Sequence, residues 1–410
     1  MTPDSKYHGQ HPYGAQYIWD TLFMLEPLCL LPGQTEVVRE VLRNFWEFQD
    51  AWDAIVPEHA RGMIQHGFHP DAFLPTACKG NSCSPWLAWG VERIYNHTGD
   101  ETMAHEALPH LERYHDWYWR ERDLDGIGLI APGAYGTDQV QAMRDDSGYD
   151  FAADMDALAY IQHPRFPERG AAYGNLYGVT NTAYVVHAER CLQRLAAKLG
   201  DHAMAARRDS HLQKAVAAAR ERMWNEETGM FHTLRRDGGK VPTLTIGAFM
   251  MLLAQVPTPA QAERILGNLR TPNWLTPLPM PTVGRGDPKW EPATIGMLPN
   301  PPVRLDHLGQ AYNMWRGDVW PPCNYQVAMG AAAYGATDLA ARICDATVMN
   351  AIQWDDVNER YCCDTGRPLG PSDYGMSACV LSMVYDGLPQ RYGATNTFTT
   401  KPQRSGQRFS

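Results

Sequence analysis

The 410-residue sequence lacks the features of a nucleic-acid-binding or membrane protein. Positive charge is in deficit, because 36 Lys and Arg face 46 Asp and Glu, for a net charge of −10. Phosphate binding needs a basic surface, so this balance argues against nucleic acid and against an anionic membrane. No apolar run approaches the roughly 18 residues of a transmembrane helix. Residues 1–16 are polar and carry no signal peptide, so we expect a cytoplasmic protein.

Several common catalytic motifs are also missing. The chain has no glycine-rich phosphate loop, no GxSxG elbow and no dinucleotide fingerprint. None of its nine cysteines forms a CxxC pair, so we expect mostly buried free thiols. His8/His11 and His66/His69 have metal-like spacing but no supporting Cys or Glu, which makes zinc improbable. We therefore expect neither a metal nor a cofactor in the chemistry.

Helical periodicity dominates the chain. Strand signals are weak, with one expected hairpin from 231–234 and 241–244 around Asp237-Gly238-Gly239. No Ser/Gly/Pro tract or charge block divides the sequence, so we expect a single domain over 1–410. A short helix is expected between Pro27 and Gly33. The longer expected helices cover 36–51, 86–97, 102–122, 180–199, 202–224, 243–254, 259–269, 325–334, 337–354 and 372–385.

Two long segments, 125–178 and 271–324, are poorly helical and rich in Pro, Gly and aromatic residues. Compact domains keep such segments mainly for function. Paired helices in a toroid, with the loops gathered at one end, would account for this pattern. The 13 Trp and 19 Tyr also suggest a carbohydrate ligand, because aromatic faces stack on sugars, although most of these side chains simply pack in a core.

Two acidic segments lie on either side of an aromatic and arginine cluster. Asp145–Phe151 and Asn358–Gly366 flank Trp315–Pro322. Two carboxylates suit glycosidic bond cleavage, in which one protonates the leaving oxygen and the other activates water or attacks the sugar. From the residues alone, Asp150 could equally cap a turn or bind a cation, and Glu359 could be a solvated surface group.

Two further motifs are ambiguous on their own. Asp20 could be the N-cap of a helix that begins near Thr21, or it could accept hydrogen bonds from sugar hydroxyls beside a Trp19 stacking wall. Arg316, flanked by Trp315 and Trp320, suits a polar ligand with a flat apolar face, or it could form a structural cation–π stack.

Taken in order, these motifs resemble a clan of inverting glycosidases. The chain is similar to glycoside hydrolase family 63 and the family 37 trehalases from about Lys6 to Gly387. The resemblance implies an all-α fold, a single (α/α)6 toroid with long loops forming the sugar pocket at one end. The motifs that carry it are Trp19-Asp20-Thr21-Leu22-Phe23, 122–129, Ser147-Gly148-Tyr149-Asp150, 179–181, 223–225, 315–325 and Glu359-Arg360-Tyr361 before Thr365-Gly366.

The resemblance also implies roles for individual residues. Asp150 matches the family's general acid and Glu359 its general base. The implied reaction is single-displacement hydrolysis of an α-glycosidic bond with inversion. We expect a short α-glucoside or α-mannoside as the substrate, so the partner is a small saccharide or glycoside, and a homo-oligomer stays an open possibility. The two long loop segments favour a deep pocket and hence exo action on the terminal sugar. The residues implied in substrate binding are Trp19, Asp20, Tyr149, Asn181, Trp315, Arg316 and Trp320.

The chain departs from the family pattern at several positions. Phe151-Ala152-Ala153 replaces an expected Asn-Ser-Pro, and Met376 replaces an aromatic residue. Small bacterial members that cleave mannosyl- or glucosylglycerate carry Gln-Pro-Pro near the third helix, where this chain has Cys83-Ser84-Pro85. We therefore expect a familiar sugar subsite and a remodelled leaving-group side.

Other functions on the same fold stay open at the level of sequence. A sugar epimerase or isomerase would place His307 or His66 in the pocket with Glu359, instead of Asp150. A sugar-binding protein without turnover would keep the pocket alone. A helical repeat scaffold should show internal self-similarity, and the chain shows none beyond helix pairing.

Overall fold

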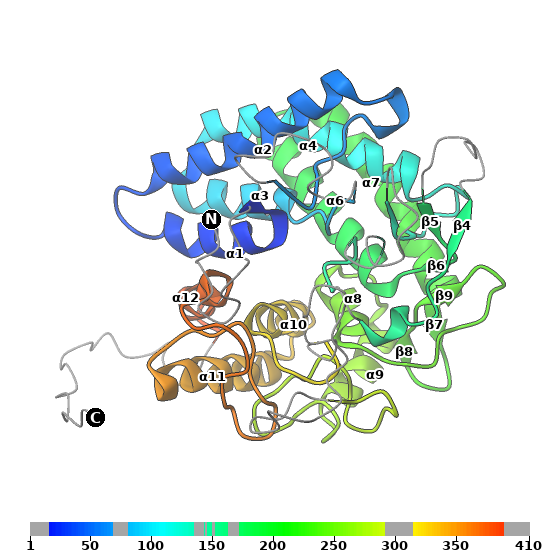
Figure 1. Cartoon of the computed structure of the whole chain (residues 1–410), viewed down its shortest axis with the longest axis vertical. Helices are drawn as coiled ribbons and strands as arrows, with labels where there is room; N and C mark the ends of the chain where they lie inside the picture. Colours follow the sequence, from blue (N-terminus) through cyan, green and yellow to red (C-terminus); the bar gives the residue numbers. More distant parts are fainter. Residues whose placement is uncertain are drawn as a thin grey trace.

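The computed structural model describes residues 16–68, 81–134, 143, 146–149, 152–162, 172–291 and 315–388. Within these ranges the inner helices contact one another in a closed circle, which Figure 1 shows in chain order. The ring runs through α1 (Ile18–Cys29), α3 (Leu87–Thr98), α6 (Val179–Lys198), α8 (Met250–Leu253), α10 (Pro321–Ala333) and α12 (Cys379–Tyr385), and α12 contacts α1 again. The fold is an (α/α)6 barrel, as the resemblance implies.

An outer layer of helices packs around this ring. Its members in the described chain are α2 (Thr35–Ile55), α4 (Glu101–Glu121), α7 (His202–Ala218), α9 (Pro259–Leu269) and α11 (Thr337–Trp354). In α2 the buried side chains recur at helical spacing, so one face meets the core and the other meets solvent. Inner helices such as α6 and α10 are buried nearly all round, which explains their weak amphipathic pattern.

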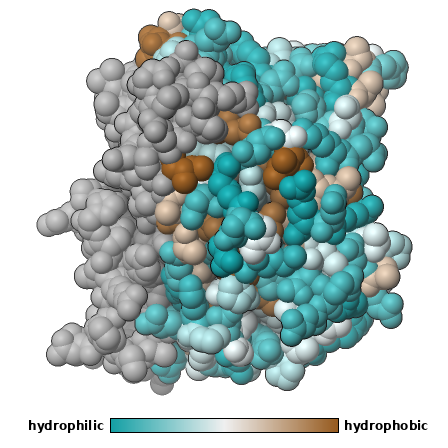
Figure 2. Space-filling view, turned by 90° about the vertical axis from the view of Figure 1, so that its right-hand side faces the viewer, coloured by the Kyte–Doolittle hydropathy of each residue, from teal (hydrophilic) through white to brown (hydrophobic). Residues whose placement is uncertain are grey.

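Strands are short and occur in the connections. Two pairs and one triplet are β1 (Gln16–Tyr17) with β2 (Gly67–Phe68), β6 (Leu176–Tyr177) with β9 (Leu234–Arg235), and β3 (Gly133–Ala134), β5 (Ala172–Gly174) and β4 (Tyr160–Gln162). A further hairpin joins β7 (Trp224–Asn225) to β8 (Met230–Phe231). The surface of the right-hand side of the molecule is mainly hydrophilic, with isolated hydrophobic patches (Figure 2).

Several expected boundaries were wrong. The first helix begins at Ile18 and contains Pro27, so Pro27 does not begin a separate helix. The expected helices at 243–254 and 372–385 each start with a 3-10 turn, at Ile246–Phe249 and Gly375–Ala378. The turn at 237–239 exists, but β9 pairs with β6, and Leu234 makes an isolated bridge with Lys240.

The ring is closed by a buried polar cluster that joins four inner helices. Arg93 of α3 donates to Glu26 of α1 at 2.5 Å and to Asp386, just after α12, at 2.7 Å. Tyr325 of α10 donates to the other Asp386 oxygen at 2.6 Å. Glu26 is fully buried and Arg93 largely so. Buried charges are tolerated when they are paired, so this cluster stabilises the closure.

No helix in the described ranges is long and apolar enough to cross a membrane. The described cysteines are all buried. Cys78, His8, His11 and His69 lie outside the described residues.

Candidate active site

Four of the predicted site residues lie where inner helices begin. Trp19 and Asp20 lie in the first turn of α1, and Asn181 lies in the first turn of α6. Trp320 is the N-cap of α10, where Pro321 and Pro322 occupy the first helical positions, which suit proline because their N–H groups would have no partner. Consecutive inner helices alternate with outer ones, so their N-termini share one end of the barrel. The sequence therefore brings these residues to a common location.

Trp19 packs into an aromatic cluster at this end. Its ring lies 5.4 Å from that of Trp86, the N-cap of α3, and 5.5 Å from that of Tyr184 on α6. Tyr149 makes an edge contact with Trp19 at 6.0 Å. Trp19 is buried, with 4% of its surface exposed. The cluster thus ties the starts of three inner helices to the loop that carries Tyr149.

Tyr149, Trp315 and Trp320 form a stack of three rings. Trp315 lies 4.5 Å from Tyr149 at 29° and 4.2 Å from Trp320 at 4°. The Tyr149 hydroxyl lies 2.5 Å from that of Tyr184, which donates to Gln326 on α10 at 2.8 Å. Because rings cover both sides of Trp315, it fixes the spacing between two loops.

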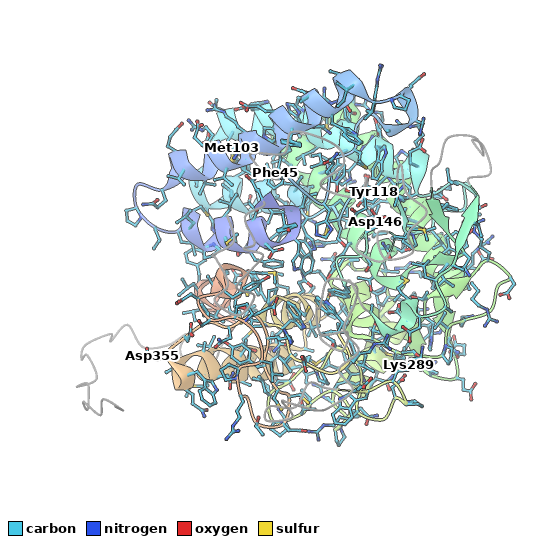
Figure 3. All side chains as sticks on the ribbon, in the orientation of Figure 1. Phe45, Met103, Tyr118, Asp146, Lys289 and Asp355 are labelled. Atoms are coloured by element: carbon cyan, nitrogen blue, oxygen red, sulfur yellow. The ribbon has the colours of Figure 1, made fainter. Side chains whose placement is uncertain are left out.

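Asp150 itself lies outside the described residues. The preceding segment is held by Asp146, whose buried carboxylate accepts from Arg122 at 2.9 Å and from the Ser82 amide at 3.1 Å. Asn181 donates to the Asp146 carbonyl at 3.3 Å. Figure 3 shows Asp146 in the interior near Tyr118. The loop before Asp150 is therefore anchored on both its side-chain and backbone atoms.

The 82–85 segment packs directly against this loop. The Ser84 hydroxyl donates to the Ser147 carbonyl at 2.7 Å, and Gly148 adopts φ +78° beside Ser84. A side chain at Gly148 would be strained there. Ser82 and Ser84 are buried, and the Ser84 hydroxyl is turned toward the 147–149 backbone. The Cys83-Ser84-Pro85 segment, one of the departures from the family pattern, therefore supports the loop that precedes Asp150.

The segment after Asp150 is anchored in the same way. Asp154 is buried and accepts from the Thr233 hydroxyl at 2.5 Å, and burial raises the pKa of its carboxyl despite that hydrogen bond. The Asp156 carboxylate accepts hydrogen bonds from Nη1 and Nη2 of Arg316, at 2.9 and 2.5 Å, and from Lys289 Nζ at 2.6 Å. Figure 3 shows Lys289 at the lower right of the molecule. Arg316 thus links the segment that follows Asp150 to the 315–320 segment.

Glu359 is a buried carboxylate, with 4% of its surface exposed. Its Oε2 accepts from Arg360 at 2.7 Å, and its amide donates to the Pro371 carbonyl at 3.0 Å. Gly370 packs so closely that a Cβ there would stand 2.6 Å from Glu359 Oε2. Asp355 and Asp364, the acidic neighbours in sequence, are exposed. Burial therefore distinguishes Glu359 where sequence could not.

Asp20 lies near Glu359. The Tyr374 hydroxyl donates to Asp20 Oδ1 at 2.9 Å. Burial raises the pKa of Asp20 to about 6, against the lowering effect of Tyr374, and the negative charge of Glu359 raises it further. The N-cap of α1 is Tyr17, so of the two alternatives for Asp20 the helix cap was wrong. A carboxyl whose pKa is raised by burial and by a neighbouring carboxylate, as for Asp20, is typical of acid/base sites.

Sequence reasoning missed several residues that build this site. Tyr184, Asp156 and Tyr374 each contact a predicted residue from a distant part of the chain, and Gln326 accepts a hydrogen bond from Tyr184. No local pattern marks them, because their partners are 35 to 354 positions away. His66 lies beside the start of α1, where its carbonyl accepts from the Ile18 amide, and His307 is outside the described residues.

Comparison of the chain with known proteins identifies its family. Residues 18–377 match the family described as "Mannosylglycerate hydrolase MGH1-like glycoside hydrolase domain". The chain belongs to this family. It is a family 63 glycosidase, as the motif order implies, and hence a glycoside hydrolase.

Individual relatives are distant. Mannosylglycerate hydrolase MGH1 of Selaginella moellendorffii is 23% identical over 420 aligned positions, covering 91% of this chain and 80% of that protein. An uncharacterized protein of Borreliella burgdorferi is 24% identical over 205 residues, covering 50% of this chain and 37% of that protein. The crystal structure of the GH63 mannosylglycerate hydrolase of Thermus thermophilus in complex with glucose has a TM-score of 0.71 at 19% identity, covering 94% and 96% of the two chains. That likeness shows the shared fold.

Proposed function

We propose that this glycoside hydrolase removes the terminal sugar from a short α-mannoside or α-glucoside, with inversion at the anomeric carbon. Asp150 is the general acid that protonates the leaving oxygen. Glu359 is the general base that takes a proton from the attacking water. Inversion requires space for that water, so the two carboxyl groups should lie about 6.5–9.5 Å apart.

The observation that carries this proposal is the buried, hydrogen-bonded Glu359 beside Asp20. Burying a carboxylate lowers the stability of the fold unless the charge is paired, and Arg360 supplies that pairing for Glu359. A charge kept in the interior in this way favours a functional role. The described segments on either side of the proposed acid are anchored at Asp146 and Asp156. Single-displacement hydrolysis needs an acid and a base that are each fixed relative to the substrate.

The remaining predicted residues divide by their contacts. Asp20 is partly exposed and is proposed to accept hydrogen bonds from the sugar hydroxyls. Trp19, Tyr149, Trp320 and Asn181 are proposed to shape the sugar pocket.

Arg316 and Trp315 are proposed to reach the substrate mainly through the loops they hold. The relatives that act on mannosylglycerate make an α-mannoside of a small hydroxy acid the first substrate to test.

The proposal is tested with a panel of α-mannosyl- and α-glucosylglycerate, the glyceryl glycosides, trehalose, kojibiose and isomaltose. Asp150→Asn and Glu359→Gln should each lower kcat by about 10²-fold or more on the consumed substrate, with the fold intact by circular dichroism. Wild-type turnover in either variant would remove that residue from its role. An epimerised sugar without hydrolysis would favour an epimerase.

A further inference from the structure

Arg360 lies between two buried carboxylates. Its Nη1 donates to Glu359 Oε2 at 2.7 Å, and its Nε donates to Asp318 Oδ2 at 2.8 Å. Asp318 is fully buried, and Arg360 is 8% exposed. Burial alone would lower the pKa of Arg360, but the two carboxylates raise it overall, so the guanidinium stays charged. One buried cation thus serves both acidic groups.

We propose that Asp318 and Arg360 are positioning residues that fix the orientation of the base Glu359. This inference rests on the proposed function of Glu359. A glutamate side chain has three rotatable bonds, and a base works only when one oxygen faces the water it activates. Arg360 occupies Oε2, which leaves Oε1 to accept the proton. Asp318 holds the guanidinium in the plane that makes this contact.

The backbone around these residues forms a fixed frame. Val319 and Tyr361 exchange both backbone hydrogen bonds, at 2.8 and 2.9 Å, which places Asp318 and Arg360 on paired segments. The Ser377 hydroxyl donates to the Asn358 carbonyl at 2.7 Å. These hydrogen bonds fix the backbone on both sides of Glu359. The Arg360 guanidinium then sets the direction of the Glu359 side chain.

The frame also continues to the acid side. Val319 belongs to the segment whose Trp315 stacks on Tyr149, the neighbour of Asp150. Moving the 315–320 segment would therefore shift both the acid and the base. Asp318 and Arg360 act on the base half of this arrangement.

The reaction itself provides a readout that separates the two halves. The water oxygen bonds to the anomeric carbon, the water proton passes to Glu359, and the carbon–oxygen bond to the leaving group breaks as Asp150 protonates that oxygen. A fluoride leaving group departs without a proton from Asp150. Weakening the base should therefore slow hydrolysis of a glycoside and of a glycosyl fluoride equally, whereas weakening the acid should spare the fluoride.

The test uses a variant that removes both charges together. Arg360→Gln alone would remove the cation that Asp318 and Glu359 share and leave two buried carboxylates, which is strongly destabilising. The double variant D318N/R360Q keeps the net charge and reduces the uncompensated buried carboxylates to Glu359 alone, so its folded fraction is measured by thermal unfolding beside its kinetics. We expect its kcat to fall about 10²-fold on both α-mannosylglycerate and α-mannosyl fluoride, with KM changed less than about threefold. R360K, which keeps the charge with a shorter reach, should recover part of the loss.

Three controls make the result decisive. Asp116→Asn alters the partner of another buried arginine, Arg208, between the outer helices α4 and α7, and should leave kcat unchanged. Asp150→Asn should lose far more activity on the glycoside than on the fluoride. Glu359→Gln should lose activity on both substrates.

Two results would overturn the positioning role while Glu359→Gln is inactive. One is a kcat for D318N/R360Q within about twofold of wild type. The other is a loss that equals the drop in folded fraction measured by thermal unfolding, since that marks a purely structural contribution. Full activity of Glu359→Gln would instead overturn the proposed base, and the positioning role with it.

Discussion

Replacing Asp20 with asparagine should stabilise the protein near neutral pH. The pKa of Asp20 rises from 3.8 to about 6 in the folded state, chiefly because the carboxyl is buried. Ionised Asp20 is therefore unfavourable in the fold. Each pKa unit corresponds to about 1.36 kcal/mol, so the penalty reaches about 3 kcal/mol at pH 7. Asparagine resembles the protonated form and keeps an oxygen to accept the Tyr374 hydrogen bond.

The pH dependence gives this prediction its sign. Because the folded pKa is raised, the stability associated with Asp20 is fully present below about pH 4 and is lost as pH rises through about 6. Urea unfolding of wild type and D20N at pH values from 4.5 to 7.5 measures the difference in unfolding free energy. We expect D20N to gain about 3 kcal/mol at pH 7 and only about 1 kcal/mol at pH 4.5.

Two outcomes would refute this reasoning. One is a stability difference that stays constant across the pH range, which would mean that the ionisation of Asp20 is not involved. The other is a wild type more stable than D20N at pH 7. Activity supplies a second comparison, because a residue that costs stability at a site is usually retained for function. D20N should raise KM for the consumed glycoside.

Two further predictions concern the ring closure and the ring stack. Glu26→Gln removes one of the two carboxylates that bind Arg93, while Asp386 remains, and should lower the unfolding free energy by about 1.5–3 kcal/mol, measured by urea unfolding; a loss below about 0.5 kcal/mol would contradict the closure role. Since the pKa of Glu26 is lowered, because His97 and Arg93 outweigh burial, its contribution should fade as pH falls. Trp315→Ala should lower the unfolding free energy by about 3–5 kcal/mol and also lower kcat, whereas Trp315→Phe should keep much of the stability and of the activity. Equal stability of the two variants would exclude a stacking role.

The fold could be read from the sequence where helices have a clear period. The expected bounds of α9 and α11 coincide with the structure, since each has a capping or periodic signal of its own. Pro27 misled the prediction for α1. It lies in the last turn, so the lost i→i−4 hydrogen bond and the kink that proline causes fall at the end of the helix. The inner helices that are buried all round lack the amphipathic pattern that marks boundaries.

The site could be predicted only in part. The motifs identified the segments, but the contacts that hold them join residues far apart in sequence, such as Asp156 with Arg316 and Asp20 with Tyr374. The choice of Glu359 over Asp355 needed burial, which no local pattern reports; Figure 3 shows Asp355 at the lower left, at the end of α11. Asp150 stays a prediction, as do the sugar and its leaving group.

The central claim is inversion by a carboxylate pair, and proton NMR of the first product tests it most directly. The wild-type protein is mixed with the α-glycoside of the panel that it hydrolyses, and the anomeric signals of the released sugar are followed before mutarotation. Our account predicts that the β-anomer appears first. An α-anomer appearing first would mean retention, would make Glu359 a nucleophile instead of a base, and would contradict the proposed mechanism.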